Sequence, residues 1–206
     1  MAESTQSLDQ PRQESLIIRI DRRIYQFARH WLLAFNIVAF TLAAMPFIVP
    51  FIASQGYTGL ANGLYTSLGL MCHQMPERSF TLFGEQMGLC HRMSAIYIAS
   101  FFSGIGYALV RNRLSPLGFR GLILLSTPMA IDGFTQLFGL RESVWELRLI
   151  TGTLFALGAM WFALPRLESG FADIRNVLET RFRRLVREGR SNSLSSARSV
   201  KGSGSE

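Results

Sequence analysis

The sequence predicts an all-α membrane protein, a polytopic bundle of four transmembrane helices with additional interfacial and amphipathic helices. Three observations support this fold class. Hydrophobic residues make up 49% of the 206-residue chain and charged residues only 17%, which leaves too little polar surface for an ordinary soluble domain. The apolar residues fall in blocks of about 20 residues, the length of helix that crosses a bilayer. The basic residues are distributed unevenly between these blocks.

Four apolar blocks are predicted to span the membrane, at about 31–53, 93–111, 115–138 and 147–165. Roughly thirty polar and charged residues precede the first block, unlike a cleavable signal peptide, so we expect this span to remain in the mature protein. Residues 54–92 form the predicted outer loop of the domain 31–165. Within this loop, Gly56 to Met71 is uncharged and contains four glycines. We interpret it as an interfacial helix, with a fifth crossing as the alternative.

The basic residues predict the orientation of the spans. Residues 1–30 carry five arginines, the region 111–120 where the second and third spans meet carries three, and the segment after Pro165 carries nine basic residues. The other two connections share only four of the 21 basic residues. The positive-inside rule therefore predicts a multi-pass membrane protein with both termini in the cytoplasm. The net charge of +7 indicates orientation and attraction to anionic lipid rather than a nucleic-acid partner.

Two amphipathic segments flank the spans. In the cytoplasmic segment 1–30, Leu16, Ile20 and Ile24 recur at helical spacing opposite arginines, and 166–188 has the same type of pattern. Each is predicted to form an amphipathic helix on the inner surface of the bilayer. Residues 189–206 are rich in Ser, Arg and Gly, a composition typical of a disordered tail.

The segment 71–93 contains both cysteines of the chain, each followed by a histidine, and four of its eight methionines. Cysteine and histidine together suit zinc, whereas sulfur ligands suit Cu(I), so a copper or zinc ion is one hypothesis. The candidate metal ligands are Cys72, His73, Cys90, His91 and Met93.

Other interpretations of the two cysteines stay open. On an outward-facing segment in an oxidising compartment, Cys72 and Cys90 could form a structural disulfide. They could instead be unpaired structural residues. A labile bond between them would support thiol redox chemistry with a partner.

Asp132 is the only acidic residue inside the predicted spans. A carboxylate in the membrane is costly unless it has a partner or a water-filled cavity. Gln136 lies one turn later on the same helix face, which should therefore point into the bundle. A structural ion pair and a functional carboxylate are both compatible with this pattern. The candidate polar site is Asp132 and Gln136 with Arg141, Glu142, Arg78 and Arg92, in which the three arginines are the candidate counter-ions.

Several short motifs lie between Tyr65 and Gly158: Cys72-His73-Gln74, Glu77-Arg78-Ser79-Phe80, Cys90-x-Arg92, Asp132-Gly133-x-Thr135-Gln136 and Arg141-Glu142-Ser143. Their combination resembles a family of small prokaryotic membrane proteins classed as a domain of unknown function. The resemblance implies a protein of the prokaryotic cell (inner) membrane whose shared residues lie on the outward loops and the outer half of the third span. Such proteins typically have Cys-x-Arg-Cys where this chain has Cys90-His91-Arg92-Met93, and the methionine weakens a zinc site.

We therefore expect a polar site at the outer face, with metal binding or thiol redox as its chemistry. One alternative is a non-catalytic accessory or assembly subunit with protein partners in the membrane. Another is a small-solute or proton pathway that uses Asp132. The chain lacks the phosphate loop, nucleophile elbow, dinucleotide fingerprint and His-Glu-x-x-His motif of common soluble enzymes, so whether it is an enzyme is left open.

Overall fold

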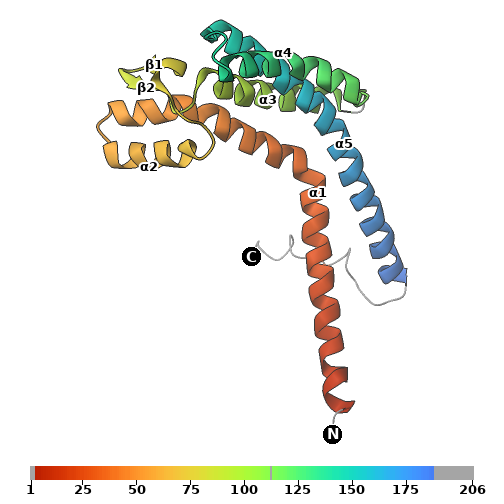
Figure 1. Ribbon diagram of the computed structural model, residues 1–206. Helices are drawn as coiled ribbons and strands as arrows, with labels where there is room; N and C mark the ends of the chain where they lie inside the picture. Colours follow the sequence, from red (N-terminus) through yellow and green to blue (C-terminus); the bar gives the residue numbers. More distant parts are fainter. Residues whose placement is uncertain (1–2, 112, 188–206) are drawn as a thin grey trace. The chain divides into compact units, whose positions relative to one another are not determined.

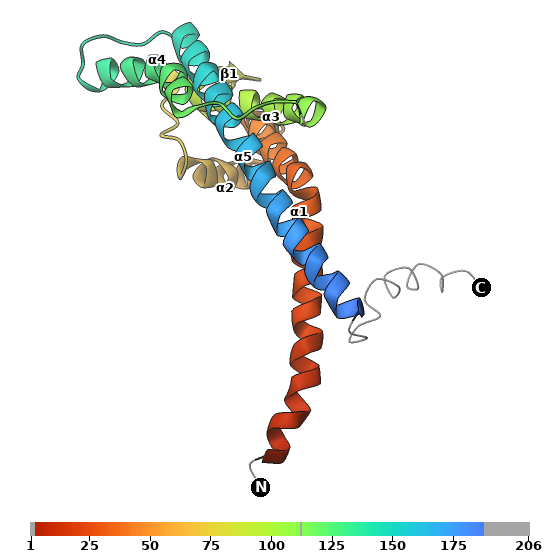
Figure 2. The same ribbon diagram turned by 90° about the vertical axis from the view of Figure 1, so that its right-hand side faces the viewer.

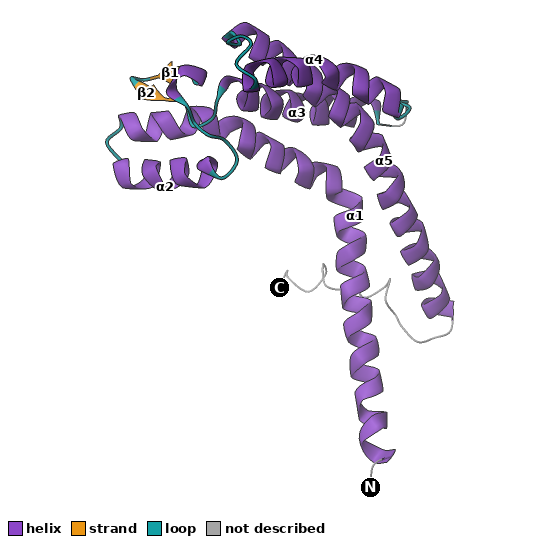
Figure 3. Cartoon of the chain, viewed as in Figure 1, coloured by secondary structure: helices purple, strands orange, loops and turns teal. Residues whose placement is uncertain are grey.

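The computed structural model describes residues 3–111 and 113–187, and the predicted tail 189–206 lies outside them. The described residues form five α-helices, one 3-10 turn and one short hairpin, so the predicted all-α fold class is confirmed (Figures 1 and 3). In chain order the elements are α1 (Glu3–Ser54), α2 (Thr58–Gly69), the 3-10 turn (Pro76–Arg78), β1 (Thr81–Leu82), β2 (Glu85–Gln86), α3 (His91–Val110), α4 (Phe119–Leu137) and α5 (Trp145–Arg187).

The chain divides into two compact units. Among the described residues, one unit combines 3–31 with 167–187, and the other is Leu32–Arg166. Helices α1 and α5 each contribute to both units, because neither helix breaks where its amphipathic segment meets its apolar segment. The sequence predicts separate amphipathic helices within 1–30 and at 166–188. In the structure the first segment is continuous with the predicted span 31–53 in α1, and the second is continuous with the predicted span 147–165 in α5.

In the first unit the N-terminal part of α1 packs along the C-terminal part of α5. Trp31 stacks on Phe171 with ring centroids 5.2 Å apart, and the indole N–H of Trp31 donates a hydrogen bond to Glu168 over 2.9 Å. Arg181 pairs with Asp21 over 2.8 Å. The two amphipathic segments therefore contact each other (Figure 2).

In the second unit the C-terminal part of α1 packs against α2 and the loops that follow it (Figure 1). The core of this region is formed by Val49, Leu68, Cys72 and Leu89. A Cβ atom on Gly88 would lie 2.9 Å from Leu68 Cδ1. Glycine therefore allows the segment that leads into α3 to pass close to α2. This packing buries Cys72 beside the segment that leads into α3.

The hairpin β1–β2 reverses the chain between the two cysteines. Thr81 pairs with Gln86 and Leu82 with Glu85 in an antiparallel register. The two turn residues, Phe83 and Gly84, have φ values of 56° and 81°, and positive φ at both positions is the signature of a tight two-residue hairpin turn. The reversal returns the chain from the 3-10 turn to the Cys72 loop.

Three helices in the described part of the chain are long and apolar enough to cross a membrane: Leu16–Ser54, His91–Val110 and Trp145–Arg187. They contain the predicted spans 31–53, nearly all of 93–111, and 147–165. The predicted span 115–138 is helical as α4, a 19-residue helix, but α4 is not among these three. The count of four spans therefore stays a prediction.

Helix α2 has only 12 residues and is about 18 Å long at 1.5 Å per residue. The hydrocarbon core of a bilayer is about 30 Å thick. This length fits the interfacial helix that the sequence predicts better than a fifth crossing.

Helix α3 approaches α1 and α5 closely through glycines. A Cβ atom on Gly104 would clash with the side chain of Asn36 in α1. A Cβ atom on Gly152 in α5 would lie 2.9 Å from the carbonyl oxygen of Arg92. Small residues at such crossings let membrane helices approach closely, and Gly152 lets α5 approach the first turn of α3, which carries Arg92.

Candidate functional site

The two cysteines lie side by side as free thiols in the structure. The backbone N–H of Cys90 donates a hydrogen bond to Cys72 Sγ over 3.3 Å. The Cys90 thiol and the backbone N–H of Gln74 also donate to this sulfur. These donors, the Cys90 thiol first, lower the pKa of Cys72 from 9.0 to about 5, against the opposing effect of burial. The same contact raises the pKa of Cys90, because its proton is held by the Cys72 sulfur.

Gln74 fixes the loop that carries Cys72. Its side-chain Nε2 donates hydrogen bonds to the carbonyl oxygens of Tyr65 and Gly88, each over 2.9 Å. Its own carbonyl oxygen accepts a hydrogen bond from Gln86 Nε2 over 2.6 Å. Gln74 has a φ of 49°, in the left-handed region. One side chain thus joins α2, the Cys72 loop and the segment before Cys90.

Asp132 is 1% exposed and both of its oxygens are engaged. Arg141 Nη2 donates to Oδ1 over 2.7 Å. Ser143 Oγ donates to Oδ2 over 3.0 Å, and Arg92 from α3 also pairs with Oδ2. Two of the three candidate counter-ions are therefore found at Asp132, and their charge offsets the cost of burying the carboxylate.

Gln136, one turn after Asp132, links the remaining arginines. With its amide oriented to satisfy the local hydrogen bonds, its side-chain oxygen accepts from Arg78 Nη2 over 3.1 Å and from Arg148 Nη2 over 3.0 Å. Arg78 was also a candidate counter-ion of Asp132, but it contacts the neutral Gln136. Within the described part of the chain, the Nε atoms of Arg92 and Arg148 are buried without a hydrogen-bond partner.

A cavity of about 270 Å³ joins the thiol pair to the arginine network. It therefore brings together residues from the Cys72 loop, the 3-10 turn, α3, α4 and α5. The lining residues are Met71, Cys72, His73, Gln74, Met75, Arg78, Cys90, Arg92, Met93, Met129, Gln136 and Arg148.

The sequence-predicted residues divide between this cavity and its surroundings. Asp132 and Arg141 are not among the lining residues, and Glu142 is exposed. Asp132 pairs with both Arg92 and Arg141. His91 does not line the cavity and instead packs on Phe80, with ring centroids 4.1 Å apart. The other candidates, Cys72, His73, Cys90, Met93, Gln136, Arg78 and Arg92, are all part of the lining.

Sequence reasoning did not assign roles to Arg148, Ser143, Gln74 and Met129. Ser143 follows Arg141 and Glu142 in the connection that leads into α5, and Arg148 lies in the first turn of α5. Their proximity to a predicted counter-ion was the available signal. Gln74 adjoins the Cys72-His73 pair, whereas nothing in the spacing singles out Met129.

The geometry of the described residues does not support the metal hypothesis. Among residues 3–111 and 113–187, no group of three or more His, Cys, Asp and Glu side chains is arranged to hold a metal ion. The soft ligands in the cavity are the two thiols and the thioethers of four methionines. This ligand set is one that Cu(I) accepts and zinc rarely uses.

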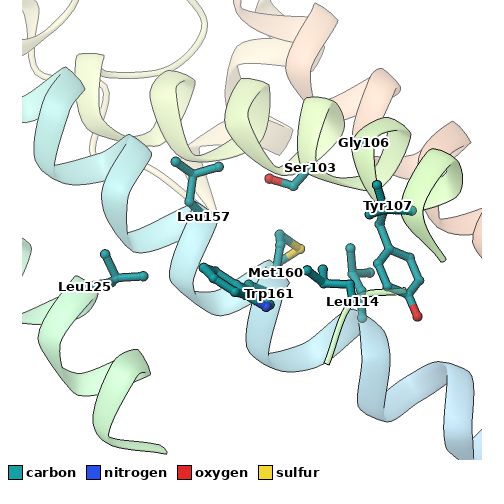
Figure 4. A pocket seen from close by; sticks show the side chains of 10 residues that line it. Ser103, Gly106, Tyr107, Leu114, Leu125, Leu157, Met160 and Trp161 are labelled. Atoms are coloured by element: carbon teal, nitrogen blue, oxygen red, sulfur yellow. The ribbon is translucent and has the colours of Figure 1, made fainter. Parts of the chain in front are cut away.

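A second cavity, of about 430 Å³, lies between the C-terminal half of α3, α4 and α5. Met160 and Trp161 of α5 line it together with Leu114, Leu125 and Ser103 (Figure 4). None of its described lining residues is acidic or basic. The described lining of this cavity therefore lacks the cysteine, histidine and arginine side chains that line the first one.

The sequence of the chain matches a known protein family. A family described as "Predicted membrane protein (DUF2085)" matches residues 72–162, a range that begins at Cys72 and includes every residue of the thiol pair and the arginine network. Comparison with solved structures finds no match.

Two archaeal relatives resemble the chain, and both are described as uncharacterized proteins. The relative from Methanocaldococcus jannaschii is 39% identical over 127 residues, which cover 58% of this chain and 81% of the relative. The relative from Methanothermobacter thermautotrophicus is 36% identical over 88 residues, covering 43% of this chain and 79% of the relative. The chain therefore belongs to the DUF2085 family of predicted membrane proteins.

Proposed function

We propose that this membrane protein carries out thiol–disulfide exchange at its outer face, with Cys72 as the attacking thiolate and Cys90 as the resolving thiol. The observation that carries the proposal is the contact between two free thiols that line one cavity. The thiolate is the reactive form of cysteine, and the hydrogen bonds to Cys72 Sγ lower its pKa to about 5.

The exchange proceeds in two balanced steps. Cys72 thiolate attacks one sulfur of a substrate disulfide, which forms a mixed disulfide and releases the other sulfur as a thiolate. Cys90 then gives its proton to the released thiolate or to water and attacks Cys72 Sγ, which forms the Cys72–Cys90 disulfide and releases the second substrate thiolate. The steps run in reverse when a reduced thiol attacks the Cys72–Cys90 disulfide.

The surroundings of Cys90 favour the second step. Its pKa is raised first by its hydrogen bond to Cys72 and then by burial, and the first of these causes disappears when Cys72 enters the mixed disulfide. The backbone N–H groups of Arg92 and Met93 still lower the pKa of Cys90. Cys90 also precedes the first turn of α3, where the helix dipole stabilises an anion. Formation of the mixed disulfide at Cys72 therefore lowers the pKa of Cys90 and makes its thiolate easier to form.

The proposed topology has α4 as the fourth span and both termini in the cytoplasm. The pairing of Asp132 with Arg92 and Arg141 supports it, because it compensates the only carboxylate in α4. In this topology the positive-inside rule is obeyed and the thiol cavity lies on the outer side. Labelling of Cys72 in intact cells by a membrane-impermeant maleimide tests the orientation. Labelling only after the membrane is opened would contradict it.

Cu(I) binding is the second candidate function, favoured by two thiols and four thioethers in one lining. The three arginines in the same lining oppose Cu(I) binding, because positive charges repel a cation. Metal analysis of protein purified in detergent, after incubation with Cu(I) and washing, distinguishes the two. One copper per chain that is lost in Cys72→Ser would favour metal binding over exchange.

The exchange itself is tested with detergent-purified, reduced protein and bis(2-hydroxyethyl) disulfide. We expect loss of both thiols and an intramolecular Cys72–Cys90 disulfide, identified by peptide mass spectrometry. Cys90→Ser should stop at a mixed disulfide on Cys72, and Cys72→Ser should react far more slowly. If the wild-type protein forms no such disulfide, or if Cys90 alone forms the mixed disulfide, the proposed roles are wrong.

A further inference from the structure

The arginines of the thiol cavity indicate what it binds. We infer that the cavity is a site for a small carboxylate-bearing anion, so that the substrate of the exchange is a disulfide that carries carboxylate groups. This inference rests on the proposed exchange for the disulfide part of the substrate, while the anion site stands on the charges of the lining.

The described lining of the cavity is strongly cationic. It contains Arg78, Arg92 and Arg148, and no aspartate or glutamate. Asp132 does not neutralise all three, because its oxygens are engaged by Arg92, Arg141 and Ser143. The partner of Arg78 and Arg148 in the network is the neutral amide of Gln136. Even with Cys72 ionised, positive charge remains in excess.

The guanidinium groups also have unused hydrogen-bond donors. Arg148 is only 7% exposed and its Nε has no partner among the described residues. The Nε of Arg92 is also buried without a hydrogen-bond partner among the described residues. A buried donor without a partner is costly, and a carboxylate that accepts from it removes this cost. Arginine binds carboxylates through two parallel hydrogen bonds, a geometry that a single-atom anion cannot match.

The size of the cavity limits the ligand. Its volume of about 270 Å³ lies below the range of about 300–1,000 Å³ that is typical for drug-sized ligands. Both thiols and all three guanidinium groups share this one lining. A short disulfide with a carboxylate on each arm can therefore contact an arginine and a thiol at the same time, whereas a long peptide cannot be enclosed.

The test compares three small disulfides that differ in charge: anionic dithiodiglycolate, neutral bis(2-hydroxyethyl) disulfide and cationic cystamine. Rates of Cys72–Cys90 disulfide formation are divided by the rates of the same reagents with a free model thiol, to remove intrinsic reactivity. We expect the normalised rate to fall in the order anionic, neutral, cationic, with at least a tenfold difference between the first two. Added salt should reduce this difference.

Matched variants locate the effect. The double variant Arg78→Gln, Arg148→Gln should lose most of the anion preference while it still reacts with the neutral disulfide. The double variant Arg113→Gln, Arg120→Gln removes the same charge at two exposed positions outside the cavity, and it should keep the preference. If the Arg78→Gln, Arg148→Gln variant does not fold, protection of wild-type Cys72 from iodoacetamide by succinate replaces this comparison.

The possible failures are distinguishable. Equal normalised rates for the anionic and neutral disulfides, without protection by succinate, would overturn the anion site and leave the exchange intact. If none of the three disulfides oxidises the pair, the proposed exchange is wrong. In that case protection by succinate supports the anion site on its own, and its absence overturns that site as well.

Discussion

The backbone N–H of Cys90 points at Cys72 Sγ over 3.3 Å, across 18 positions of sequence. The hairpin of Phe83 and Gly84 makes this contact possible, because it turns the chain back toward the Cys72 loop. The donors gathered at this sulfur make Cys72 the more acidic thiol and Cys90 the less acidic one.

The reactivity of Cys72 should be nearly independent of pH from about pH 6 to pH 8, where an ordinary thiol with a pKa of about 8.5 gains reactivity steadily. Its pKa of about 5 is a lowered value, so the thiolate is present above pH 5 and is lost as the pH falls through it. The measurement is the alkylation rate of Cys72 by iodoacetamide, followed by peptide mass spectrometry. Cys90→Ala should move the midpoint of this pH profile upward, because it removes the thiol that lowers the pKa of Cys72 most. A midpoint near pH 8.5 in the wild-type protein would contradict the prediction.

Asp132→Asn should destabilise the protein by about 3–5 kcal/mol, because it leaves the buried guanidinium group of Arg92 without its carboxylate. Arg141→Gln removes another partner from the same site, but the Arg141 side chain is 44% exposed. We therefore expect a loss below about 1 kcal/mol for that variant. Chemical denaturation in detergent measures both. Equal losses for the two variants would mean that the ion pair with Arg92 is not the dominant contact.

Gly152→Ala should destabilise the packing of α5 on α3 by about 1–3 kcal/mol. The new Cβ would lie 2.9 Å from the Arg92 carbonyl oxygen and 3.3 Å from Ala95 Cβ, and a backbone atom cannot move aside without separating the helices. Gly106→Ala in α3 is the matched control, since no atom lies within 4 Å of its Cβ position. The control should be neutral or slightly stabilising. Thermal unfolding in detergent distinguishes the two variants.

Gln74→Asn should slow formation of the Cys72–Cys90 disulfide several-fold. Asparagine tolerates the positive φ of this position, but its amide is one methylene too short to reach both the Tyr65 and Gly88 carbonyls. The Cys72 loop then loses two hydrogen bonds of about 1 kcal/mol each. Gln55→Asn, at an exposed position, serves as the control. If both variants form the disulfide at the wild-type rate, Gln74 does not hold the thiols together.

Much of the fold was predictable because it depends on local properties of the chain. The apolar blocks at 31–53 and 147–165 lie in helices that are long and apolar enough to span a membrane. Their continuation into the amphipathic segments was not predicted. Trp31 and Phe171 stabilise that continuation by a contact between distant segments, which leaves no trace in the periodicity of either one.

The candidate site was predictable in its residue types and only partly in its pairings. A lone acidic residue in an apolar span requires a counter-ion, so Arg92 and Arg141 could be proposed for Asp132, and both are found there. Arg78 was proposed on the same ground and instead contacts Gln136. Net charge along the sequence cannot distinguish these outcomes, because all three arginines lie in connections on the same predicted side.

The sequence by itself determined that this is a helical membrane protein with its sulfur and polar residues gathered near one end of its spans, because hydrophobicity is a property of each segment alone. The tertiary structure decided that Cys72 and Cys90 are in contact, that Asp132 is engaged on both oxygens and that three arginines line the same cavity as the two cysteines. These features depend on helix crossings at Gly104 and Gly152 and on one tight hairpin. Their distances arise only when segments far apart in the chain pack together.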